Sequence, residues 1–155
     1  IIAFNYGAQN RKRIVRTWKI SLIAGIVMMA LMTAVFLLLP DQILGLFNAT
    51  PEMLRIGRAA LTIIPLSLML SSVSINCSVM FQAIGKGSYS MYLSLARQLL
   101  VLIPAAWLLS RLFGEVTAVW WAFPITEAFT ITMALSMFAY IYNRRIRTMP
   151  TEPPL

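Results

Sequence analysis

The stretch ISLIAGIVMMALMTAVFLLL, residues 20–39, decides the fold class of this chain. It contains 20 residues, none of them charged. As an α-helix it is about 30 Å long, which matches the hydrocarbon thickness of a bilayer. Because lipid offers the backbone no hydrogen-bond partners, a helix is the conformation in which such a segment can cross it. The run therefore predicts a membrane-spanning helix.

Three more apolar runs follow the first one. The chain has 155 residues, of which 59% are hydrophobic and 12% are charged. That charged fraction is about half of what a soluble domain carries. Before the second run, Thr50-Pro51-Glu52 has the order of a helix start, with a cap, a proline and an acid. We therefore predict an all-α, polytopic membrane helical bundle with four transmembrane helices, at about 20–39, 59–83, 91–109 and 116–142.

The positive charges predict the orientation of these spans. The net charge is +8, and the Lys and Arg residues gather at the ends of the apolar runs, which argues against a nucleic-acid partner. When four spans alternate, ten of the 13 basic residues fall on one side, and Arg55, Arg58 and Arg111 fall on the other. The positive-inside rule then puts both termini in the cytoplasm. We expect a multi-pass protein of the plasma (inner) membrane, surrounded by the lipid bilayer, with a disordered cytoplasmic tail at 150–155.

Several classes of function have no support in the sequence. The chain has no histidine and one cysteine, Cys77, and it shows no cluster of metal ligands. No nucleophile, base and acid fall within reach of one site. We therefore expect no enzyme, no metal and no cofactor. Because residue 1 is Ile rather than Met, we also expect the chain to be the carboxy-terminal part of a longer protein.

Glu127 is the best candidate for a functional residue, because it lies within the fourth apolar run. An ionisable group inside a span is costly and suggests function by default. A carboxylate that charges and discharges there could couple transport to a cation or a proton. Two other interpretations stay open. Glu127 could form a structural ion pair with Arg97 of the third span, or it could be a packed, protonated side chain.

Other polar and aromatic residues could line a substrate cavity. Aromatic surface beside one acid suits a hydrophobic cation. The serines and Asn76 of the second span could equally serve close helix packing. Pro65, Pro104 and Pro124 bend their spans, either for movement or for packing. The candidates for the cavity are Ser71, Asn76, Trp120, Phe123 and Thr130.

Four ordered stretches carry a resemblance to a known family. They are FNYGAQNRKRI (4–14), ILGLFNATPEMLRIGRAAL (43–61), the long segment FQAIGKGSYSMYLSLARQLLVLIPAAWLL (81–109) and VWWAFPITEAF (119–129). In this order they resemble the multidrug and toxic compound extrusion (MATE) family of secondary transporters. The residues that belong to the shared pattern are Asn5, Gly7, Gln82, Gly85, Arg97, Pro104 and Pro124.

The resemblance implies a larger assembly. Family members have twelve spans in two six-span lobes, so residues 1–149 would be the end of span eight and spans nine to twelve, part of one lobe. The missing amino-terminal lobe would be its partner. The family exports small cationic, amphipathic drugs or toxins by proton- or sodium-coupled antiport. Some branches bind sodium through an acid in span ten, but the matching region here, 70–82, contains no acid.

Two other functions remain alternatives. A flippase for lipid-linked saccharides would belong to the same superfamily, although it would need more basic residues inside the membrane to hold a pyrophosphate. A self-sufficient four-span homodimeric membrane protein would also fit four spans and one membrane acid.

Overall fold

The computed structural model of the chain describes residues 1–48 and 50–151. Within these residues the regular elements are all helical, which confirms the all-α class. Residues 152–155, most of the predicted disordered tail, lie outside the described residues. The elements are α1 (Ile2–Gly7), α2 (Arg11–Leu38), α3 (Pro40–Gly45), α4 (Pro51–Ala83), α5 (Gly87–Leu95), α6 (Ile103–Phe113), α7 (Val116–Val119) and α8 (Ala122–Ile141), with π-helical segments η1 (Ala96–Leu102) and η2 (Tyr142–Ile146).

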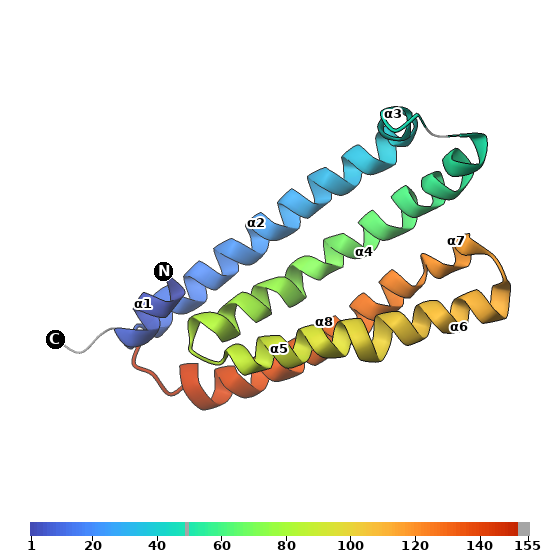
Figure 1. The fold of residues 1–155 in the computed structure, drawn as a ribbon. Coiled ribbons are helices and arrows are strands. Elements are labelled where there is room, and N and C mark those ends of the chain that lie inside the picture. Colours follow the sequence, from blue (N-terminus) through green and yellow to red (C-terminus); the bar gives the residue numbers. More distant parts are fainter. Residues whose placement is uncertain (49, 152–155) are drawn as a thin grey trace.

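Four helical stretches are long and apolar enough to cross a membrane, and they coincide with the four predicted spans. They are Arg11–Leu38, Pro51–Ala83, Gly87–Phe113 and Val116–Ile146. The third span joins α5, η1 and α6, and the fourth joins α7, α8 and η2. Figure 1 shows both termini at one end of the bundle, together with the turn between α4 and α5. We call this the terminal end and the opposite one the distal end.

The second span begins where its sequence predicts. Thr50 precedes α4, and its hydroxyl oxygen accepts a hydrogen bond from the Met53 N–H at 3.4 Å. At the same distal end, Arg58 of α4 forms a salt bridge of 2.6 Å with Asp41 of α3. Both side chains are more than half exposed, so the bridge stabilises the fold by less than about 1 kcal/mol.

Helix α4 packs on the first span along most of its length. Close to the terminal end, the Ser21 hydroxyl donates to the Asn76 side-chain oxygen at 2.7 Å. One turn along, a Cβ on Gly25 would lie 3.0 Å from the Asn76 side-chain nitrogen, so glycine allows the two helices to approach closely there. Further towards the distal end, the Thr33 hydroxyl donates to the carbonyl of Pro65 at 2.8 Å. Small and hydroxyl side chains thus hold two membrane helices together, as is common in lipid.

Pro124 explains a break in the fourth span. Proline has no N–H, so the carbonyl of Trp120 cannot receive the usual bond from residue 124. Instead, the Phe123 N–H donates to the Trp120 carbonyl at 3.2 Å, which tightens the turn. Helix α7 therefore ends at Val119 and α8 begins at Ala122.

The third span is irregular just before Pro104. Segment η1 is π-helical, and the Ile103 N–H bonds to the carbonyl of Gln98, five residues back. Pro104 offers no N–H to the carbonyl of Leu100, so the regular α-helical pattern cannot run through this point. Short π-helical segments inside α-helices are frequent at functional sites. Pro65, in contrast, lies inside the continuous helix α4.

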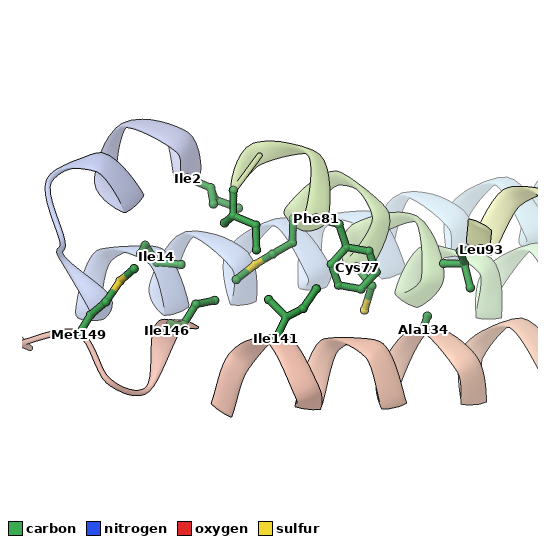
Figure 2. Close-up of a cluster of buried hydrophobic side chains, with 11 residues drawn as sticks. Ile2, Ile14, Cys77, Phe81, Leu93, Ala134, Ile141, Ile146 and Met149 are labelled. Carbon is green, nitrogen blue, oxygen red and sulfur yellow. The ribbon is translucent and has the colours of Figure 1, made fainter. Parts of the chain in front are cut away.

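The buried apolar side chains gather at the terminal end. Figure 2 shows them between α1, α2, α4, α8 and the chain after η2. Phe81 and Ile14 are fully buried at the centre of this cluster. It thus joins elements from both ends of the sequence. The cluster contains Ile2, Ile14, Cys77, Met80, Phe81, Ile84, Leu93, Ala134, Ile141, Ile146 and Met149.

Gly85 forms the turn that ends α4. Its φ is +75°, a left-handed conformation that glycine adopts without steric cost. The Gly85 N–H donates to the Gln82 carbonyl at 3.0 Å, and the Lys86 N–H donates to the Phe81 carbonyl at 2.7 Å. This is the bonding pattern of a Schellman helix end. The glycine of the shared sequence pattern therefore has a backbone role.

We predict that Gly85→Ala destabilises the protein by about 1–2 kcal/mol, because an alanine Cβ is strained in the left-handed region. The thermal unfolding midpoint of the full-length protein in detergent measures this effect. Gly87→Ala is the matched control, since Gly87 begins α5, has no positive φ and has open space around a Cβ. Equal midpoints for the two variants would contradict the assignment.

Candidate functional site

An ion pair joins the third and fourth spans inside the bundle. Arg97, the second residue of η1, places a terminal guanidinium nitrogen 2.5 Å from a carboxylate oxygen of Glu127 on α8. The Glu127 side chain is only 2% exposed, whereas that of Arg97 is 30% exposed. The ion pair between Glu127 and Arg97, which the sequence left as one of three interpretations, is therefore formed.

The pair leaves part of the carboxylate without a partner. Among the described residues, the second oxygen of Glu127 is buried and accepts no hydrogen bond. The nearby hydroxyls of Thr126 and Thr130 donate instead to carbonyls of their own helix, at 2.6 and 2.7 Å. A buried acceptor without a partner is costly. This oxygen is thus available to bind a proton, a cation or a water molecule.

A small polar cavity lies next to the pair. It has a volume of about 210 Å³, and Arg97 and Thr130 form part of its wall. The rest of the wall comes from α4 and α5 and includes the amide of Gln82. A cavity of this size and polarity has room for water. It lies between the α4–α5 turn at the terminal end and the level of the ion pair.

Two facing polar stripes build this cavity. On α4 the stripe is Ser74, Ser78 and Gln82, and on the third span it is Ser90, Ser94 and Arg97. Gln82 donates to the Ser90 hydroxyl at 2.8 Å, which joins the stripes near the turn. Residues spaced three and four apart lie on one helix face. The spacing of Ser90, Ser94 and Arg97 was therefore the signal in the sequence that could have identified this side of the cavity.

Ser71 and Asn76 are both occupied in helix contacts. The Ser71 hydroxyl donates to the carbonyl of Ser67 in the same helix at 3.4 Å. Asn76 accepts from Ser21 of α2 and donates to the carbonyl of Ser72. Asn76 therefore ties α4 to the first span, and its role in a substrate cavity stays a prediction. Thr130, another predicted cavity residue, lines the polar cavity beside Arg97.

Trp120 and Phe123 lie at the break between α7 and α8. Their ring centroids are 6.5 Å apart, and both side chains are partly buried. The indole N–H of Trp120 is buried and has no acceptor among the described residues. The two rings form an aromatic surface with one unused donor on the distal side of Glu127.

The amino-terminal motif residues lie at the terminal end. Asn5 is buried, and its side chain donates to the carbonyl of Ile1 at 2.9 Å. The backbone carbonyl of Asn5 accepts from the Asn10 N–H at 2.9 Å. The side-chain oxygen of Asn10 in turn accepts from the Arg13 N–H and so caps α2. Asn5 thus orients the start of the first span. Gly7 has open space around the position of a Cβ, so packing does not explain a glycine there.

Comparisons with known proteins give consistent matches. The family model described as MatE matches residues 1–108. The Multidrug export protein MepA of Staphylococcus haemolyticus (strain JCSC1435) is 31% identical over 147 residues, which are 95% of this chain and 31% of that protein. The chain thus spans about a third of the length of this relative. No solved structure matches the chain.

We predict that Arg97→Met destabilises the protein more than the double variant Arg97→Met/Glu127→Met does. The single change leaves a buried carboxylate without its cation, which costs about 3–5 kcal/mol for fully buried pairs. The partial exposure of Arg97 puts the expected loss at or below the lower end of that range. Thermal unfolding midpoints of the full-length protein measure the difference.

Arg111→Met is the control for this cycle, because it removes one charge at the exposed end of the third span, where Arg111 lies over the Trp107 ring. Additive effects of the Arg97 and Glu127 substitutions would show that the two side chains do not interact.

Proposed function

Because the chain belongs to the MatE family, we propose that it is the carboxy-terminal part of an exporter of cationic, amphipathic drugs or toxins. The family match and the name of the MepA relative support this proposal. In the full-length protein, an amino-terminal lobe would complete a central cavity. Transport would proceed by alternating access, in which the two lobes rock around that cavity.

The observation that carries the coupling proposal is the half-paired carboxylate of Glu127. One oxygen contacts Arg97, and the other is buried without a partner among the described residues. When Glu127 gains a proton, its charge disappears and Arg97 loses its counter-ion. When the proton leaves, the pair forms again. The third and fourth spans would thus be held together in one protonation state and released in the other.

A proton suits this site better than a sodium ion. Sodium would need several oxygen ligands and would lie close to the Arg97 guanidinium, which repels it. The polar cavity beside Arg97 offers water a way towards the pair from the terminal end. We therefore propose proton-coupled antiport.

An organic cation would meet the aromatic surface of Trp120 and Phe123. Aromatic faces attract cations and cover their apolar parts. These two side chains share the distal half of the fourth span with Glu127. A bound cation would then compete with Arg97 for the same carboxylate, which links export to the protonation of Glu127.

The charges at the two ends support an orientation in the membrane. Arg144 and Arg145 belong to η2, and Arg147 follows it. This segment lies beside the basic start of α2, because Arg11 donates to the Tyr142 hydroxyl and to the Arg147 carbonyl. The distal end contains three basic and three acidic residues, namely Arg55, Arg58, Arg111, Asp41, Glu52 and Glu115. The terminal end would therefore face the cytoplasm of a plasma membrane.

We predict that Glu127→Gln in the full-length protein abolishes drug efflux or flattens its pH dependence. Glutamine keeps the shape of the side chain but cannot bind and release a proton. Ethidium efflux, measured at several pH values with and without sodium, tests this.

Glu115→Gln is the matched control, because Glu115 is an exposed acid in the connection before α7 and accepts a bond from Thr117. Unchanged efflux and pH dependence in the Glu127 variant, at normal expression, would remove Glu127 from the coupling mechanism. A sodium requirement that persists at every pH would contradict proton coupling.

A further inference from the structure

A second, larger cavity lies at the terminal end, between the start of α2 and η2. Its volume is about 630 Å³. Tyr142 and Thr151 form one side of it, and one face of α2, from Arg11 to Ile23, forms the other. It is separate from the polar cavity beside Arg97, with which it shares no residue.

The α2 side of this groove changes from basic to apolar along the helix. Lys12, Arg16 and Lys19 follow one another at spacings of four and three residues, so they form one stripe. All three are exposed. Ile20 and Ile23 continue the same face one turn further into the span, where they are 58% and 62% exposed. The groove thus has basic side chains at its entrance and exposed apolar side chains directly below them.

Arg11 also lines the groove, but its guanidinium already has hydrogen-bond partners within the chain. Its guanidinium donates to the Tyr142 hydroxyl at 3.1 Å and to the carbonyl of Arg147 at 3.3 Å. It also lies 5.8 Å from the centre of the Tyr142 ring. These contacts hold the start of the first span against the end of the fourth. They therefore fix the distance between the two sides of the groove.

The charge of the stripe is not balanced within the described part of the chain. There, the side chains of Lys12, Arg16 and Lys19 form no salt bridge, and no acid lines the groove. Three like charges over about two helical turns repel one another. A bound anion would remove that repulsion.

We propose that this groove binds one anionic phospholipid of the surrounding leaflet. The phosphate would lie among Lys12, Arg16 and Lys19, and an acyl chain would extend along Ile20 and Ile23. Basic pockets between spans at the cytoplasmic face are where anionic headgroups bind. The placement in the cytoplasmic leaflet depends on the proposed orientation. A soluble anion would use the cations but leave the isoleucines uncovered.

The test measures lipid binding to the full-length protein, purified in neutral detergent and depleted of lipid. Native mass spectrometry compares dioleoylphosphatidylglycerol with dioleoylphosphatidylcholine. We expect the anionic lipid to bind about tenfold more tightly or better, because each nearby basic residue adds to its affinity. In Lys12→Gln/Arg16→Gln/Lys19→Gln this preference falls to about twofold or less.

Two further variants make the result specific to the groove. Arg13→Gln/Arg144→Gln/Arg145→Gln removes the same charge from the terminal end outside the groove, and it should keep the preference. Lys12→Arg/Arg16→Lys/Lys19→Arg keeps the charge and should keep the preference, which excludes a general failure to fold.

Three results would overturn the proposal. The first is the absence of any preference in the unmodified protein, as expected if the rest of the full-length protein covers the groove. The second is equal loss in both glutamine triple variants. The third is displacement of the lipid by excess inorganic phosphate, which would make the site one for a free anion. Because the readout is lipid binding, it is independent of efflux and of Glu127.

Discussion

The Glu127 carboxylate is almost completely buried between apolar helices, and the surrounding structure is arranged to place a cation beside it. Segment η1 has π-helical geometry where it presents Arg97, and α8 begins anew after the break before Pro124. Both irregularities lie in the two spans that the ion pair connects. In lipid, a break in a helix is tolerated only where neighbouring groups satisfy the backbone. Pro104 and Pro124 therefore account for the irregularity of these two spans, and the ion pair connects the irregular segment η1 to α8.

The two ends of the bundle differ in the kind of contact that holds them. The terminal end contains the cluster around Phe81 and Ile14, and Arg11 fastens the first span to the fourth. The distal end is held by exposed contacts such as the Asp41–Arg58 bridge. Interiors packed like the terminal end resist deformation. The terminal end is therefore the more firmly packed of the two.

The polar groups of this chain have distinct structural tasks in the membrane. Asn76 and Thr33 connect α4 to the first span, with Gly25 allowing the close approach. The stripes from Ser74 and Ser90 instead form a cavity that leads to Arg97. Serines on the same helix thus differ in role according to the neighbour they face. The serines, whose number and spacing suggest helix packing, therefore also line a polar cavity beside Arg97.

The sequence by itself determined the four helical spans, the start of the second helix and the segregation of charge. Each of these depends on local properties: the length of apolar runs such as residues 20–39, the cap at Thr50 and the positions of Lys and Arg. Gly85 was identified only as part of the shared pattern, and its left-handed turn came from the structure. The resemblance in the ordered stretches identified the family on the same local basis.

Only the tertiary structure decided how residues distant along the chain meet. Sequence reasoning left Glu127 between three interpretations, because pairing with Arg97 depends on how two helices are rotated about their axes. It also left Asn76 between helix packing and a cavity, and the structure adds a hydrogen bond from Ser21 of α2 to Asn76. Helix periodicity gives the residues of one face but not the partner that this face meets. The rotation is set by packing over the whole bundle, which no single segment of sequence contains.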